Sequence, residues 1–323
     1  MRLLERFVVR KDHRSTWAAV PVAMLLIAVL AGCSQQQLDG FMPGERGTTD
    51  KGDLMMTFWV NSWIILLVVG LITWGLLIWA AVVYRRRRND TGLPKQMRYH
   101  QPMEVFFTVV PIILVAGFFA FTARDQAIVE QNFAADQASA VAGQEVRDVH
   151  IEVYGKQWAW DFNYLDVAGS PYDGGVYTQG IQAQEERDEN DRLTGEIEYE
   201  KLPVLMLPVG ANVTLDLKSR DVAHSFWVPD FHYKEDTIPG KTNQYSFVPE
   251  REGVYIGKCA ELCGEYHSMM LFEVHVVSEA EYNEYIQSLR DAGNVGAVGD
   301  EGNRNDNLPG TEAPDFSEHD ESK

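Results

Sequence analysis

The sequence predicts a two-helix transmembrane hairpin followed by an all-β sandwich or barrel. Two uncharged apolar runs, residues 59–84 and 105–123, lie in the first half of this 323-residue chain. Several short segments rich in β-branched and aromatic residues come later, and glycine and proline separate them. Apolar runs of this length can each cross a bilayer, whereas the later segments are too short to do so.

The N-terminus has the features of a secretory signal. Basic residues precede an apolar run at 17–30, and the sequence Leu-Ala-Gly-Cys occupies 30–33. This ending resembles a bacterial lipoprotein signal. We therefore expect residues 1–32 to be removed, Cys33 to be lipidated and residues 33–55 to form a short outer segment. An ordinary signal or an uncleaved helix is the alternative.

The hairpin is expected at residues 56–125. The loop between its helices carries four consecutive arginines at 85–88, then Lys95 and Arg98. Because short loops rich in Lys and Arg stay in the cytoplasm, both ends of the mature chain should lie outside the cell membrane. A buried hairpin of a soluble protein is the alternative.

The outer part divides into three segments. Residues 126–145 form a polar linker, residues 146–290 a globular domain, and residues 291–323 an acidic tail without apolar periodicity, which we expect to be disordered. The stretch at 166–200 is an acidic insert, either disordered or an interaction element. Strands are expected at 149–154, 203–207, 212–218, 244–248, 253–258 and 271–277.

The chain is strongly acidic, with 28 basic and 47 acidic residues and a net charge of −19. The excess lies outside the basic hairpin loop, so the charge excludes a nucleic-acid partner and suits a basic protein partner. Solubility accounts for much of the same charge.

Soft metal ligands cluster at 259–270. Cys259, Cys263, His267 and Met270 lie within twelve residues, and His224 lies upstream. Thiolate, thioether and imidazole together favour copper, whereas a thioether is not a usual zinc ligand. The alternative for two close cysteines in an exported domain is a disulfide.

The motifs Cys-x-Glu-x-Cys-x-x-x-His-x-x-Met and Asp-Val-x-His-Ser resemble those of cytochrome c oxidase subunit II, and the resemblance covers about residues 56–280. It implies a cupredoxin-like Greek-key sandwich with a two-copper centre, CuA. The implied ligands are His224, Cys259, Glu261, Cys263, His267 and Met270. The cysteines would bridge both ions, each histidine would bind one ion, and the thioether and the Glu261 carbonyl would be weak outer ligands.

Three further roles follow from the same resemblance. Trp158, in Tyr-Gly-Lys-Gln-Trp-Ala-Trp at 154–160, corresponds to the residue through which electrons reach the copper; packing on a strand face is the alternative. The Glu261 side chain would bind magnesium or manganese beside subunit I. Glu104 would lie at the mouth of a proton channel; the alternative is an acidic residue interacting with a helix N-terminus.

The resemblance implies the electron-accepting subunit of a proton-pumping oxidase in a bacterial plasma membrane. Electrons would come from a c-type cytochrome or the haem c subunit of a cytochrome bc complex, and would pass to haem in subunit I, where oxygen is reduced; subunit III is a further partner. The lipoprotein signal and acidic insert resemble actinobacterial members. The alternatives are a membrane-anchored copper chaperone or storage lipoprotein, and a disulfide-stapled adhesion domain.

Overall fold

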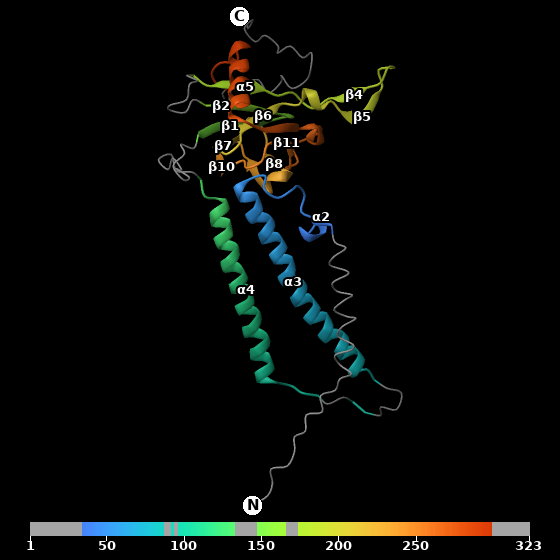
Figure 1. Ribbon diagram of the computed structural model, residues 1–323. Helices are drawn as coiled ribbons and strands as arrows, with labels where there is room; N and C mark the ends of the chain where they lie inside the picture. The colour runs from blue at the N-terminus through green and yellow to red at the C-terminus, as the bar shows by residue number, and fades with distance from the viewer. Residues whose placement is uncertain (1–33, 87–91, 94–95, 133–146, 166–173, 299–323) are drawn as a thin grey trace, which may run out of the picture. The chain divides into compact units, whose positions relative to one another are not determined.

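The computed structural model describes residues 34–86, 92–93, 96–132, 147–165 and 174–298 (Figure 1). The predicted signal peptide, Cys33, most of the linker and residues 299–323 lie outside these ranges. The chain divides into two compact units, residues 1–42 and 43–323. Within the first unit, the short helix α2 (Gln35–Leu38) is capped by Ser34, whose hydroxyl accepts from the amide of Gln37.

Two long helices, α3 (Asp50–Val83) and α4 (Gln101–Val129), form the predicted hairpin. Both are long and apolar enough to cross a membrane, and the most apolar stretch of each helix is not buried against other parts of the protein. The alternative of a buried hairpin in a soluble protein is therefore wrong. Helix α3 begins before the predicted limit of 56, because its polar first turn is capped by Thr49, whose hydroxyl accepts from the amide of Gly52. Helix α4 continues past the predicted limit of 125 to Val129.

The beginning of α3 is bonded to the end of α4 and to the β domain. The ammonium of Lys51 donates to the carbonyls of Val129, at 2.8 Å, and Gln131, at 2.6 Å. The carboxylate of Asp50 accepts from the amide of Val248 at 2.8 Å. The Lys51 bonds join the two helices, and the Asp50 bond links the hairpin to the β domain.

Two five-stranded sheets make up the β domain (Figure 1). The first has the order β10-β7-β1-β2-β3, and the second β6-β12-β11-β8-β9. Strands β1 and β7 pair in parallel, as do β6 and β12, and the other neighbours are antiparallel. The bounds are β1 (Asp148–Lys156), β2 (Ala159–Tyr164), β3 (Val176–Gln179), β6 (Val204–Pro208), β7 (Asn212–Ser219), β8 (His224–Val228), β9 (Tyr233–Thr237), β10 (Asn243–Phe247), β11 (Gly253–Cys259) and β12 (Leu271–Val277).

The hydrophobic core comes from strands that bury alternate residues. Along β12, Phe272, Val274 and Val276 are buried, while Glu273 and His275 are half-buried, as their alternation predicted. The rings of Trp160 and Phe226 join Phe272 in an aromatic cluster. The predicted fold class, a helical hairpin followed by an all-β sandwich, is confirmed.

The described part of the acidic insert is ordered. It contains β3 of the first sheet and a separate two-stranded hairpin, β4 (Glu185–Arg187) and β5 (Leu193–Ile197), followed by a short 3-10 helix, η1 (Tyr199–Lys201). Disorder is therefore the wrong interpretation for residues 174–200. Leu193 and Ile197 are the two apolar residues of its strands, which is too few to form an apolar alternation by which to recognise it.

Ordered structure also continues past the predicted domain end at 290. Helix α5 (Glu279–Asp291) buries Tyr282, Ile286 and Leu289. Val295 then bridges to Val176 of β3, and the carbonyl of Val298 accepts from the amide group of Asn163 at 2.9 Å. The prediction of disorder is wrong for residues 291–298, because single backbone contacts hold this segment and leave no periodic pattern.

Candidate metal centre

The ligand loop joins two neighbouring strands of the second sheet. Strand β11 ends at Cys259 and β12 begins at Leu271; between them lie Cys263, the 3-10 helix η3 (His267–Met269) and Met270. Strand β8 lies on the other side of β11, with Phe226 paired to Cys259. This pairing brings His224, the first residue of β8, to the loop although 35 positions separate it from Cys259.

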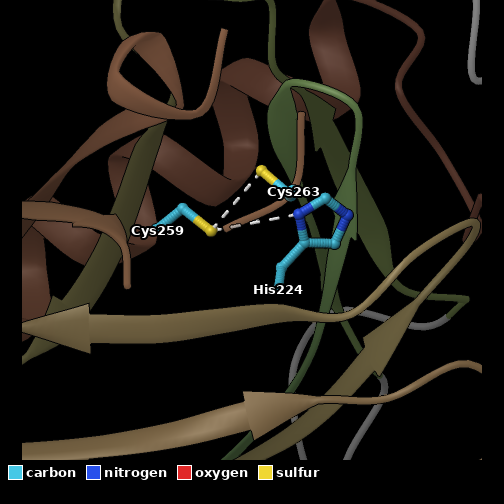
Figure 2. Close-up of side chains that lie close together, drawn as sticks. All are labelled: His224, Cys259 and Cys263. Atoms are coloured by element: carbon cyan, nitrogen blue, oxygen red, sulfur yellow. Dashed lines mark hydrogen bonds between the residues drawn. The ribbon is translucent and has the colours of Figure 1, made fainter. Parts of the chain in front are cut away.

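The two sulfur atoms lie at the centre of the site (Figure 2). The Sγ atoms of Cys259 and Cys263 are 3.8 Å apart, and both residues are free thiols. A disulfide would place the sulfurs about 2.05 Å apart. The disulfide alternative, and with it the stapled adhesion domain, is therefore wrong.

Imidazole, thioether and carbonyl donors surround the sulfur pair. His224 Nδ1 lies 3.9 Å from the Cys259 Sγ, and His267 Nδ1 lies 3.5 Å from the Cys263 Sγ. The Met270 Sδ is 3.9 Å from the Cys263 Sγ, and the Glu261 carbonyl oxygen is 3.2 Å from the Cys259 Sγ. All six predicted ligands are thus brought together; we call them the ligand cluster.

The ligand cluster is largely shielded from water. Cys259 and Cys263 are 5% and 4% exposed, and His224 and Met270 are fully buried. His224, Cys259 and Cys263 also form a group whose ligand atoms all lie within 4.8 Å of one another, close enough to hold a metal.

The two thiols do not ionise independently. The hydrogen bond from Cys263 lowers the pKa of Cys259 to about 3, against the opposing effect of burial. The same hydrogen bond, together with burial, raises the pKa of Cys263. Cys259 is therefore the more acidic thiol of the pair, and a metal cation bound to both sulfurs would displace the protons that they hold.

Asp221 orients the ligand His224. Its Oδ1 lies 2.8 Å from the His224 Nε2, so the ring donates there and turns Nδ1 toward the sulfurs. Burial lowers the pKa of His224, but the hydrogen bonds with Asp221 and Cys259 outweigh it and raise that pKa. The sequence contained this signal in the Asp-Val-x-His spacing, but no role had been predicted for Asp221.

Trp158 lies beside the ligand cluster, on the turn of residues 157–158 between β1 and β2, which we call the Trp158 turn. Its indole N–H donates to the Cys263 carbonyl at 3.2 Å, and the Gln157 side-chain amide donates to the same oxygen at 2.7 Å. The indole also meets the Tyr266 ring edge-on, with centroids 5.0 Å apart. Trp158 is half-buried, whereas Trp160 is buried in the core, as the strand-face alternative describes.

Comparison with known proteins identifies the family. The family model described as "Cytochrome C oxidase subunit II, periplasmic domain" matches residues 149–277. The chain is 36% identical over 313 residues to a probable cytochrome c oxidase subunit 2 of Streptomyces avermitilis, covering 90% of this chain and 91% of that protein. The chain belongs to the cytochrome c oxidase subunit II family.

A further curated relative agrees with this assignment. Cytochrome c oxidase subunit 2 of Mycobacterium tuberculosis is 31% identical over 302 residues, covering 82% of this chain and 79% of that protein. Among solved structures, the periplasmic domain of subunit II (CoxB) of Bradyrhizobium japonicum is 26% identical and covers 45% of this chain and 94% of its own, with a TM-score of 0.36.

As a subunit II, the chain is part of an oxidase complex, and the predicted family is confirmed. Its sandwich is the cupredoxin-like domain that the resemblance implied. The family implies copper, and the donors fit it: two thiols, two imidazoles and a thioether are soft or intermediate ligands, and only one carbonyl oxygen accompanies them.

Two further predicted roles involve carboxylate side chains that do not face the sulfur pair, those of Glu261 and Glu104. The Glu261 side chain is exposed on the ligand loop. Glu104 is in the first turn of α4, where its carboxylate accepts from the amide of His100 at 3.0 Å. At a rise of 1.5 Å per residue, it lies roughly 37 Å along this 29-residue helix from Val129 at the other end. The structure therefore does not bring Glu104 to the ligand cluster.

Proposed function

We propose that this chain is the electron-accepting subunit of a proton-pumping cytochrome c oxidase and holds a two-copper CuA centre. The observation that carries the proposal is the pair of free thiols 3.8 Å apart, with an imidazole nitrogen beside each sulfur. Cys259, Cys263, His224 and His267 would be the principal residues that hold the two copper ions. Bound copper would supply reversible one-electron exchange between a c-type haem and the haem of subunit I.

The chain's own residues would assist this exchange by holding the site fixed. Asp221 keeps the Nδ1 of His224 turned toward the sulfurs, and burial of Cys259 and Cys263 limits water at the ions. A site whose ligands move little on electron transfer exchanges electrons without a large reorganisation of the protein. The half-buried ring of Trp158 gives the donor a route to the Cys263 carbonyl.

Several finer assignments belong to the same proposal. Glu261 would bind magnesium or manganese beside subunit I through its exposed carboxylate, and Glu104 would serve a proton channel. Subunits I and III would be membrane partners, with a c-type cytochrome or a haem c subunit of a bc complex as donor. The β domain would lie on the extracytoplasmic side of a bacterial plasma membrane, after removal of residues 1–32 and lipidation of Cys33.

The test is paramagnetic resonance on the purified oxidase complex together with its copper content. We expect a signal from one unpaired electron shared equally by two coppers, and two coppers for each copy of this chain. A signal localised on one readily exchanged copper would contradict the proposal and favour the chaperone or storage alternative.

A further inference from the structure

A buried ion cluster lies behind the Trp158 turn, outside the ligand cluster. It consists of Lys156, Asp161 and Arg220, whose side chains are at most 1% exposed. The Lys156 Nζ lies 2.9 Å from the Asp161 Oδ1, and the Arg220 Nη2 lies 3.2 Å from the Asp161 Oδ2. The guanidinium of Arg220 also covers the ring of Tyr154, 4.2 Å from its centroid.

The ion cluster joins the Trp158 turn to the approach to His224. Lys156 is the last residue of β1, directly before the turn, and Asp161 lies on β2 directly after it. Arg220 immediately precedes Asp221, and its backbone amide donates to the Gly155 carbonyl at 3.0 Å. The turn and the segment that orients His224 therefore share one set of ionic contacts.

A third segment reaches the same carboxylate. The amide of Gly180 donates to the Asp161 Oδ1 at 3.0 Å. Three residues further on, the amide of Ala183 donates to the carbonyl of Met269, next to the ligand Met270. Asp161 thus links the Trp158 turn, the approach to His224 and the segment against the ligand loop.

Stability alone does not account for an ion cluster in this place. Charged side chains lose their hydration when they are buried, and apolar side chains of similar volume are often as stabilising as buried ion pairs or more so. Trp160 and Phe162, on the same strand as Asp161, show that apolar residues pack well here. Unlike apolar packing, buried charges tolerate few arrangements, because each must keep its partner.

We propose that Lys156, Asp161 and Arg220 are positioning residues for electron transfer. They hold the Trp158 turn in the one arrangement that places the indole N–H at the Cys263 carbonyl. Their electron-transfer role rests on the proposed function, because it requires that electrons pass through Trp158. Their effect on the geometry of the turn does not depend on it.

The test uses Lys156→Met in the full-length chain within the oxidase complex. The remaining Asp161–Arg220 pair is charge-balanced, so the fold should persist, with unchanged copper content and paramagnetic resonance signal. Hydrogen–deuterium exchange in a peptide covering residues 155–160 should rise by about tenfold, while peptides from β11 and β12 stay protected.

In native membranes, which contain the natural donor, quinol-driven copper reduction should slow by about fivefold or more. Reduction by hexaammineruthenium(II), which needs no docking site, should be unchanged.

The matched control is Lys218→Met. It removes the same charge from the neighbouring strand β7, but Lys218 pairs with Glu152 in the middle of β1 and not at the turn. Hydrogen–deuterium exchange at residues 155–160 and the rate of quinol-driven copper reduction should both remain those of the wild type. If Lys156→Met does not accumulate, the double variant Lys156→Met/Asp161→Asn, which keeps the net charge of the ion cluster, gives the same readouts.

Wild-type exchange at residues 155–160 in a folded variant would overturn the positioning role. Raised exchange with an unchanged donor rate would overturn the electron-transfer part of the proposal. Absence of a shared two-copper signal in the wild type would instead contradict the proposed function, and the exchange measurement would still decide the positioning role.

Discussion

The ligand cluster and the Trp158 turn lie side by side but are held in different ways. The donor atoms of the ligand cluster lie 3.2 to 3.9 Å from their nearest sulfur, and most of them come from one short loop. The turn is held by hydrogen bonds of 2.7 to 3.2 Å to the Cys263 carbonyl, and by a buried ion cluster behind it. The ligand cluster is thus defined by the chemistry of its donors, and the turn by its tertiary contacts.

If the proposed function is right, this difference separates the residues that bind copper from those that deliver electrons to it. Changes in the ligand cluster should remove or alter copper, whereas changes in the turn should leave copper in place and alter the rate at which it is reduced.

Replacing Cys263 should have the largest effect. Cys263→Ser removes the sulfur that lies within 4 Å of Cys259, His267 and Met270, so the two-copper signal should disappear and copper content should fall. Elemental analysis and paramagnetic resonance of the purified complex measure both. Leu262→Ser, at an exposed position of the same loop, is the control and should keep its copper. Unchanged two-copper stoichiometry in Cys263→Ser would refute the ligand assignment.

Gly155→Ala tests the boundary between the two regions. A Cβ at this position on β1 would lie 2.9 Å from the His224 Cδ2 and 3.1 Å from the Thr237 Oγ1. The ring must move, at a cost of about 1–3 kcal/mol for overpacking, so the hyperfine pattern of the copper signal should change. Gly117→Ala on α4, where a Cβ meets nothing within 4 Å, is the control. A wild-type spectrum in Gly155→Ala would show that the ring position is not fixed by β1.

Trp158→Ala should slow the delivery of electrons to copper without changing copper binding. The variant loses the N–H bond to Cys263 and the contact with Tyr266, but no predicted ligand, so copper content should remain normal. Reduction by the natural donor should slow by about tenfold or more. Stopped-flow reduction in native membranes measures the rate, and Trp158→Phe, which keeps a ring, should fall between the two. Equal rates in wild type and Trp158→Ala would remove Trp158 from the electron path.

His150→Gln should have the smallest effect, because it lies in neither region. The hydrogen bond with Asp216 raises the pKa of His150. Burial opposes ionisation of Asp216, but hydrogen bonds from His150 and Gln244 outweigh it and lower that pKa. The raised His150 pKa stabilises the fold fully below about pH 6.5, and this contribution is lost as pH rises through the folded-state pKa.

The variant should therefore melt at a lower temperature than the wild type at pH 6 and at the same temperature at pH 9. Since the His150 side chain is 38% exposed, the difference should stay below about 1 kcal/mol. Thermal unfolding followed by tryptophan fluorescence measures it. An equal difference at both pH values would show that the ion pair does not contribute.

Local patterns allowed much of the fold to be predicted. The uncharged runs located α3 and α4, and the alternation in β12 identified its buried face. The polar β4–β5 hairpin and residues 291–298 were missed, because they are held by backbone pairing and single contacts that leave no periodic pattern. For the candidate site, spacing and family resemblance named every member of the ligand cluster, but not the contacts of Asp221, Gln157 or the ion cluster.

Local sequence alone specified two apolar runs long enough to cross a bilayer, and the soft donors spaced three and four residues apart in one loop. These are properties of short stretches, so they can be recognised from residue type and spacing before the fold is known. The tertiary structure alone decided that β8 lies beside β11, which brings His224 to the loop, and that the end of β1 turns Trp158 onto the Cys263 carbonyl. Strand order and register depend on packing between distant segments, which no local spacing specifies.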